Sequence, residues 1–166
     1  MITGSEGRTV VHHTFVIERD YPAALSRVFE AFVDPVVKRR WFAEGEGFAI
    51  ERLETDVRVG GNERSQFGVA GGDTVASETT YHDIVPDQRI VLDYVMTAAD
   101  RLISVSLATI ELYPAGGGTH LIYTDQGVYL DGADQPEDRE RGCRDLLEKL
   151  AAELAGQTSG DVGRTR

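Results

Sequence analysis

Aromatic and polar side chains on strand-like segments are the residues of this sequence whose types could do chemistry. A tyrosine buried inside a protein needs a hydrogen-bond partner for its hydroxyl group. Several tyrosines on one concave face, together with the amide Gln126, would form an apolar pocket with a few polar groups, the usual composition of a small-molecule site. The same side chains would equally serve as an ordinary core, and both interpretations stay open. The predicted ligand-binding residues are Trp41, Phe42, Phe67, Tyr81, Tyr94, Met96, Tyr123, Gln126, Cys143 and Leu147.

Strand-like segments also carry five carboxylates, at Glu78, Asp83, Asp93, Glu111 and Asp125. A pair of them facing inward could do general acid–base chemistry, because burial raises the pKa of a carboxyl group toward neutrality. Alternation along the strand places Asp93 opposite Tyr94, so we expect Asp93 to point outward. The faces of Glu78 and Asp125 stay open, and solvent-facing carboxylates are the favoured interpretation.

The sequence contains none of the familiar catalytic or metal-binding motifs. Its four histidines lack metal-ligand spacing, and the adjacent His12 and His13 must point to opposite faces of a strand. The glycine clusters lack the lysine of a phosphate-binding loop and are predicted to be hairpin turns. Cys143 lies on an apolar helix face, where burial raises the pKa of a thiol, so we expect it to pack rather than react. We therefore predict no catalytic residue, no metal and no cofactor.

These side chains need elements to position them, and the clearest such element is a helix over residues 137–154. Its apolar residues recur with helical period and form one continuous stripe. Pro136 suits the first helical position, Asp134 is the expected N-cap, and Gly156 is the expected stop. The stripe consists of Cys143, Leu146, Leu147, Leu150, Ala151 and Leu154, and the polar side consists of Arg139, Glu140, Arg144, Asp145, Glu148, Lys149 and Glu153.

The residues before this helix have the pattern of short strands, interrupted once by two helices. Residues 9–20 are rich in β-branched and aromatic side chains. Helical periodicity follows over residues 23–33 and 36–42, around a break at Asp34-Pro35. Six further strands are predicted at 48–59, 62–69, 74–85, 89–96, 102–113 and 119–129, with turns that include Gly60-Gly61 and Gly71-Gly72-Asp73. We expect an α+β fold, in which a curved antiparallel sheet of six to seven strands wraps around the long C-terminal helix, with two short helices after the first strand.

Three segments of the chain match the pattern of a known superfamily. They are residues 27–35 followed by Arg40-Trp41-Phe42, residues 56–61, and Gly142-Cys143 with Leu147 and Leu150 on the last helix. The chain resembles the START-like superfamily, also called SRPBCC or helix-grip. Within it, the chain is similar to the family of the heat-shock-protein-90 ATPase activator C-terminal domain. The match covers residues 11–154 and implies a hollow helix-grip fold, but it does not specify a function.

Two positions depart from the pattern of this family. Cys143 stands where the family usually has a tryptophan on the last helix, which implies a larger cavity in this chain. Gln126 stands where the family often has a histidine near the end of the last strand, which weakens any acid–base role at that point.

Length, charge and cysteine content limit the organisation and the partners. The 166 residues are expected to form one START-like domain over residues 9–156, with flexible tails at 1–8 and 157–166. A formal net charge of −11 argues against nucleic acid and anionic membranes as partners. The single cysteine fits a reducing compartment. Residues 1–8 contain no apolar signal segment, so we expect a cytoplasmic protein without a membrane span.

Three functions are compatible with these features. The favoured one is a protein that binds an apolar or aromatic small molecule, such as a lipid or a polyketide, between the sheet and the last helix. The first alternative is an enzyme of the cyclase, dehydratase or hydrolase kind in the same cavity, which would need an inward titratable group with a shifted pKa. The second, implied by the family name, is a chaperone partner that stimulates a heat-shock-protein-90 ATPase; the stand-alone domain disfavours it. A homodimer through an exposed sheet edge is compatible with the fold but not required.

Overall fold

Seven antiparallel strands form a single sheet in the order β1-β7-β6-β5-β4-β3-β2. The strands are β1 (Val10–Tyr21), β2 (Ala49–Thr55), β3 (Asn62–Gly68), β4 (Thr74–Val85), β5 (Arg89–Ala98), β6 (Arg101–Ala115) and β7 (Gly118–Leu130). This computed structural model describes residues 7–42, 49–68 and 72–158, so the predictions that fall on Phe48 and Gly71 lie outside the described residues. Strands β2 to β7 pair in sequence order and β1 pairs with β7, which confirms the expected antiparallel sheet.

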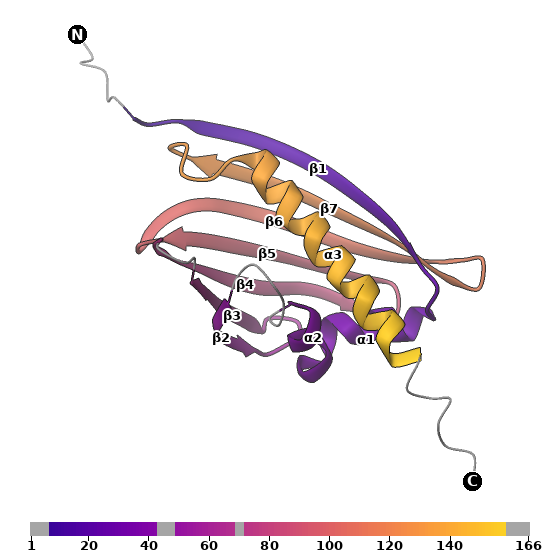
Figure 1. The fold of residues 1–166 in the computed structure, drawn as a ribbon. Helices are drawn as coiled ribbons and strands as arrows, with labels where there is room; N and C mark the ends of the chain where they lie inside the picture. Colours follow the sequence, from indigo (N-terminus) through magenta and orange to yellow (C-terminus); the bar gives the residue numbers. More distant parts are fainter. Residues whose placement is uncertain (1–6, 43–48, 69–71, 159–166) are drawn as a thin grey trace.

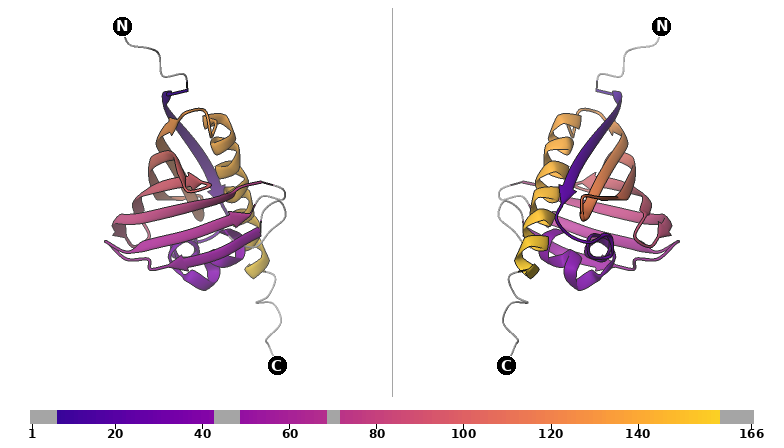
Figure 2. Two further views of the ribbon diagram at one scale, coloured as in Figure 1. Left: turned by 90° about the vertical axis from the view of Figure 1, so that its left-hand side faces the viewer. Right: turned by 90° about the vertical axis from the view of Figure 1, so that its right-hand side faces the viewer.

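Alternation along the strands gives the sheet one face that packs and one face that meets solvent. In β6, Ser104 and Ser106 are buried, whereas Val105 and Leu107 between and after them are exposed. The sheet is strongly curved, as the two side views show (Figure 2). Its concave face is therefore the one that the helices cover.

The connection between β2 and β3 is longer than the sequence predicted. The strand ends at Thr55 because the backbone then turns, and the Asp56 N–H donates to the carbonyl oxygen of Asn62 at 2.9 Å. The predicted turn at Gly60 and Gly61 is present. A Cβ atom at Gly61 would lie 2.0 Å from the carbonyl oxygen of Asp56, so only glycine fits this tight turn.

Two short helices, α1 (Leu25–Val33) and α2 (Pro35–Phe42), follow β1 and lie at one end of the sheet (Figure 1). The Asp34 side chain accepts a hydrogen bond from the Val36 N–H at 2.8 Å, which caps α2. The indole N–H of Trp41 donates to the carbonyl oxygen of Ala31 at 2.8 Å, and its ring packs edge-on against Phe32. These contacts pack the two short helices, which the sequence predicted, against each other.

The long helix α3 (Pro136–Thr158) crosses the concave face of the sheet (Figure 1). Leu147, Leu150 and Leu154 of the predicted stripe are buried against the core. The Tyr21 hydroxyl donates to the carbonyl oxygen of Leu147 at 2.9 Å, and the Arg27 guanidinium donates to that of Leu154 at 2.7 Å. The helix is thus attached to both β1 and the residues of α1, and the expected helix-grip architecture is confirmed.

Pro136 is the first residue of α3, as predicted, but the N-cap and the C-terminal end of the helix differ from the prediction. The N–H groups of Asp138 and Arg139 donate to the Gln135 carbonyl at 3.1 Å, and Asp134 forms no cap because its carboxylate pairs with the Arg139 side chain. The helix also continues past Gly156 to Thr158. A single glycine inside a helix costs only about 1 kcal/mol relative to alanine, so it does not have to end one.

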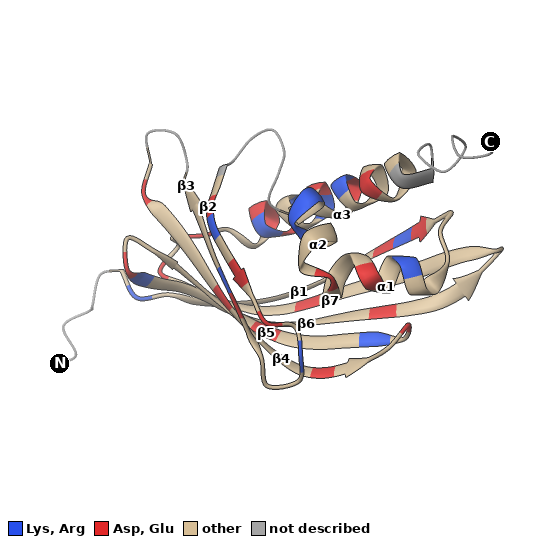
Figure 3. Cartoon of the chain, turned by 90° about the horizontal axis from the view of Figure 1, so that it is seen from below, with Lys and Arg blue, Asp and Glu red and all other residues tan. Residues whose placement is uncertain are grey.

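Acidic and basic residues are interspersed along the sequence of α3 (Figure 3). Several form ion pairs at the surface, such as Arg19 with Glu148 at 3.0 Å and Arg141 with Asp138 at 3.0 Å. Exposed pairs of this kind each contribute at most about 1 kcal/mol. Among the described residues, no helix combines the length and the apolar character needed to cross a membrane.

Candidate functional site: a cavity between the sheet and the last helix

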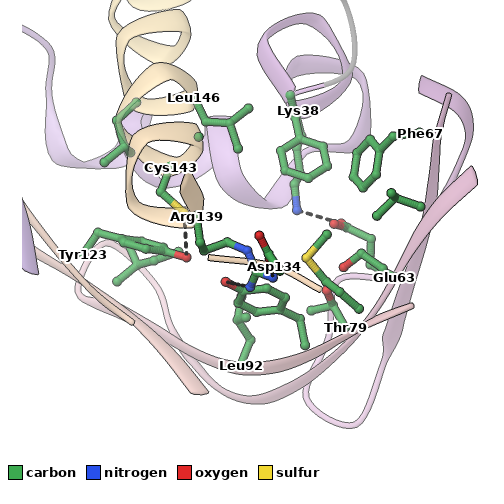
Figure 4. A pocket seen from close by; sticks show the side chains of 18 of the residues that line it. Lys38, Glu63, Phe67, Thr79, Leu92, Tyr123, Asp134, Arg139, Cys143 and Leu146 are labelled. Carbon is green, nitrogen blue, oxygen red and sulfur yellow. Dashed lines mark hydrogen bonds and ion pairs between the residues drawn. The ribbon is translucent and has the colours of Figure 1, made fainter. Parts of the chain in front are cut away.

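A cavity of about 470 Å³ lies between the concave face of the sheet and α3. This volume falls within the range of roughly 300–1,000 Å³ that is usual for small-molecule sites. Strands β3 to β7 form one wall, α3 forms the other, and α2 closes one end (Figure 4). The apolar lining includes Phe32, Val75, Ile90, Leu92, Ile103, Ile110 and Leu146.

Nine of the ten predicted ligand-binding residues line this cavity. They are Trp41, Phe42, Phe67, Tyr81, Tyr94, Met96, Tyr123, Cys143 and Leu147. Alternation in β5 explains part of this placement, because Leu92, Tyr94 and Met96 all face the cavity, while Asp93 faces the other way, as predicted, and contacts His82. Trp41, Tyr81 and Leu147 also belong to the core, so the two interpretations of the aromatic set apply together.

Gln126 is the predicted residue that does not line the cavity. It is exposed on the convex face, next to the buried Asp125. Side chains alternate along a strand, and Tyr123 points inward, so Asp125 shares its face and Gln126 does not. The inward polar group near the end of β7 is therefore a carboxyl group rather than an amide.

One polar cluster, the Lys38 cluster, consists of Lys38, Thr55, Glu63 and Tyr81. The Lys38 ammonium group lies 2.7 Å from Glu63 Oε2 and 3.1 Å from the Tyr81 hydroxyl oxygen. Glu63 Oε2 also accepts hydrogen bonds from Tyr81 at 3.0 Å and Thr55 at 2.8 Å. The Glu63 side chain is only 4% exposed, so the carboxylate is buried among three donors.

The Lys38 cluster keeps both of its charges. Burial disfavours the Lys38 ammonium ion, but the Glu63 carboxylate outweighs this effect and raises the pKa of Lys38. Burial likewise opposes the ionised form of Glu63, yet the Lys38 charge and the hydrogen bonds lower the pKa of Glu63. A charged lysine is not a nucleophile, so this pair is expected to hold α2 against β3 and β4.

A second polar cluster, the Arg139 cluster, consists of Tyr94, Ser104, Tyr123, Asp125, Asp134 and Arg139. The Arg139 guanidinium donates to Ser104 Oγ at 2.7 Å, to the Tyr94 hydroxyl oxygen at 3.1 Å, and to the Asp134 carboxylate. Its carbon also lies 5.4 Å from the centre of the Tyr94 ring. These contacts hold a cation on the cavity wall, although the whole residue is only 9% exposed.

Asp125 lies beneath the two tyrosines of the Arg139 cluster. Its Oδ2 atom accepts hydrogen bonds from the hydroxyl groups of Tyr94 at 2.5 Å and Tyr123 at 3.2 Å. Burial raises the pKa of Asp125, and these hydrogen bonds together with the Arg139 charge only partly offset that effect. Tyr94 and Tyr123 line the cavity, so they connect this carboxyl group to the cavity interior.

Cys143 is a packing residue on the cavity wall, as the sequence predicted. Burial, followed by the charge of Asp125, raises the pKa of its thiol to about 12. The thiol faces the Tyr123 hydroxyl group at 3.9 Å. A thiol with this pKa is protonated at neutral pH and does not act as a nucleophile.

The charged residues of the two clusters that sequence reasoning missed as cavity residues include Lys38, Glu63 and Arg139. Arg139 was assigned to the polar side of the last helix, which is wrong. It lies four residues before Cys143 and therefore on the same helical face, a signal that its charge obscured. Lys38 lies three residues before Trp41 on α2. Its buried partner Glu63 is on β3, so no local sequence pattern indicates that the two residues form a pair.

No group of three or more potential metal ligands occurs within residues 7–42, 49–68 and 72–158. The described polar groups that line the cavity instead provide two cations, the two carboxylates that pair with them and tyrosine hydroxyl groups, two of which donate to the buried carboxyl group of Asp125. Such a set can orient an apolar molecule through one polar group, or move a proton to or from it.

The curved sheet, the helix across it and the cavity between them define a helix-grip domain of the START-like class. The chain belongs to the family described as activator of Hsp90 ATPase homolog 1-like protein, whose model matches residues 22–155. This assignment confirms the resemblance seen in the sequence.

Solved structures of similar proteins support the assignment. The Mll3558 protein of Rhizobium loti is 49% identical, with a TM-score of 0.81 over 88% of this chain and 99% of that one. An uncharacterized protein of Rhizobium leguminosarum is 36% identical, with a TM-score of 0.85 over 89% and 97% of the two chains. CalU16 of Micromonospora echinospora, at 19% identity, a TM-score of 0.60 and 92% and 87% coverage, shares the fold. A comparison with curated proteins gives no match.

Proposed function

We propose that this protein binds an apolar or aromatic small molecule, of the lipid or polyketide kind, in the cavity between the sheet and α3. The observation that carries the proposal is the cavity itself, about 470 Å³ in volume, with a mainly apolar wall and polar groups at Lys38 and at Arg139. An apolar guest would remove this wall from water, which is favourable at about 25 cal/mol per Å² of buried apolar surface. The free thiol of Cys143 would persist in a reducing compartment, so the proposal includes a location in the cytoplasm.

A variant that fills the cavity tests this function. Cys143→Trp would place a large ring on the α3 face that lines the cavity, and we expect it to weaken binding at least about tenfold by occupying the space of the guest. Asp145→Trp puts the same ring on an exposed position of the same helix and should leave binding unchanged. A thermal-shift screen across lipids and polycyclic aromatic compounds provides the ligand. If no compound in the screen stabilises the wild-type protein, the proposed binding function fails. If the two variants bind the ligand equally well, the cavity is not the binding site.

A second candidate function is acid–base catalysis in the same cavity. The observation that favours it is the Tyr94 hydroxyl group, which lines the cavity and donates to the buried Asp125 at 2.5 Å. Tyr94 would exchange a proton with the guest, and Asp125 would position Tyr94 and take up the proton. Deuterium exchange at the activated carbon of an aromatic β-diketone, followed by NMR, tests this function. Catalysed exchange should disappear in Tyr94→Phe and change its pH profile in Asp125→Asn. If the wild-type protein does not raise the exchange rate above the uncatalysed rate, this candidate function is excluded.

A further inference from the structure

Among the described residues, two cations line the cavity, and the first of them, Lys38, is not available to a guest. Its partner Glu63 is 4% exposed, lies within β3 and accepts hydrogen bonds from Lys38, Thr55 and Tyr81. Moving this carboxylate away would take the acceptor from all three donors and leave the buried Lys38 charge with only the neutral Tyr81 hydroxyl oxygen, which is costly.

Arg139, the second cation, has a partner in a very different setting. Asp134 lies in the loop between β7 and α3, and its side chain is 21% exposed. In the part of the chain that the structure describes, its carboxylate makes no side-chain hydrogen bond other than that to Arg139. Asp134 could therefore turn toward solvent without leaving another buried group unpaired.

Arg139 would keep its position if Asp134 turned away. Ser104, at 2.7 Å, and Tyr94, at 3.1 Å, accept hydrogen bonds from the guanidinium group and belong to β6 and β5. The nearby Asp125 is not a hydrogen-bonded partner of Arg139 in the described part of the chain, since its Oδ2 atom accepts from Tyr94 and Tyr123, and burial favours its neutral form by raising its pKa. The result would be a fixed, buried guanidinium group that faces the cavity without a hydrogen-bonded counter-charge.

We propose that the guest is a carboxylate with an apolar body, and that its carboxylate replaces Asp134 on Arg139. The apolar body would extend along Leu92 and Leu146, which line the cavity. A planar guanidinium group binds a carboxylate through two parallel hydrogen bonds, whereas an ester of the same shape would leave the cation unpaired. This inference rests on the proposed function and names the chemical class of its ligand.

Two matched pairs of probes test the inference: lauric acid with methyl laurate, and biphenylcarboxylic acid with its methyl ester. Isothermal titration at neutral pH measures the four affinities for the wild-type protein. Because a hydrogen-bonded charge pair is formed only by the acids, each acid should bind at least about tenfold tighter than its ester.

Variants of the ion pair show whether Arg139 causes this preference. Arg139→Gln should bind acid and ester equally. Asp134→Asn should bind the acids several-fold tighter than wild type, because the competing carboxylate is gone, and the esters unchanged. Arg141→Gln makes the same change as the first variant at an exposed position of α3 and should retain the full preference. If Arg139→Gln does not fold, the affinities of Asp134→Asn decide the question: tighter binding of the acids supports the inference, and unchanged binding of the acids contradicts it.

The outcomes separate this inference from the function on which it rests. If acids and esters bind wild type equally, the carboxylate preference is wrong and small-molecule binding stands. If none of the four probes binds, both fail. If the acids bind tighter but neither Arg139→Gln nor Asp134→Asn alters the preference, the carboxylate is recognised elsewhere and the inference is overturned.

Discussion

The cavity contains two ion pairs of the same kind, and they differ in what surrounds the carboxylate. Glu63 lies in β3, a strand paired on both sides, and accepts three hydrogen bonds, whereas Asp134 lies in a loop and pairs with one guanidinium group. Their side chains are 4% and 21% exposed. The Lys38–Glu63 pair is therefore expected to act as a structural contact, and the Arg139–Asp134 pair as one that a ligand can open.

The comparison shows that an ion pair in a cavity does not define a function by itself. A buried pair is costly to break because each partner would remain charged and unpaired. The cost falls when one partner can reach water and the other keeps neutral hydrogen-bond acceptors. Ser104 and Tyr94 supply such acceptors to Arg139, while Lys38 has a single further polar contact, with Tyr81.

The largest expected effect is the loss of Glu63. Glu63→Gln would leave the buried Lys38 ammonium group without its counter-charge, and we expect the free energy of unfolding to fall by about 3–5 kcal/mol. Urea denaturation measures it. The control is Glu54→Gln, which removes the exposed pair with Arg52 and should cost less than about 1 kcal/mol. Equal losses in the two variants would show that the Lys38 pair is not structural.

A smaller effect is expected at Asp134. Asp134→Asn should lower the free energy of unfolding by only about 1–2 kcal/mol, because Arg139 retains Ser104 and Tyr94 and the lost partner is partly exposed. The same urea experiment measures it. A loss as large as that of Glu63→Gln would remove the distinction between the two pairs.

The smallest expected effect is a difference in pH dependence. The pKa of Asp125 is raised in the folded protein, so its contribution to stability is present below its unfolded pKa of about 3.9 and is lost as pH rises through the folded value. The pKa of Glu63 is lowered, so its contribution is present above about 4.3 and is lost as pH falls through the folded value.

Urea denaturation across acidic to neutral pH measures this difference in sign. Asp125→Asn should become more stable relative to wild type as pH rises, because the neutral amide avoids the cost of ionising the buried carboxyl group. The deficit of Glu63→Gln should shrink as pH falls. If Asp125→Asn instead loses relative stability with rising pH, folding favours the ionised form of Asp125, as it does for Glu63.

Periodicity in the sequence was enough to predict the fold. The stripe of Leu147, Leu150 and Leu154 is a local pattern, and so is the alternation of Leu92 and Tyr94. Both are set by backbone geometry rather than by distant contacts. The ends of elements were predicted less well, since Gly156 tolerates the helix and Asp134 is engaged by a side chain.

The candidate site was predicted only where apolar character and local pattern agreed. Lys38 and Arg139 were missed because charged residues are rarely buried unless they are paired, and the partner of Lys38 is brought close only by the fold. Gln126 was assigned inward although alternation from Tyr123 places Asp125 there, an error of one residue that reverses the face.

The most direct test of this account is a crystal structure of the protein with biphenylcarboxylic acid. We predict that the rings occupy the cavity between the sheet and α3, that the carboxylate lies within hydrogen-bonding distance of the Arg139 guanidinium group, and that Asp134 has turned toward solvent while the Lys38–Glu63 pair is unchanged. A ligand bound outside the cavity, or a cavity filled by its own side chains, would contradict the account.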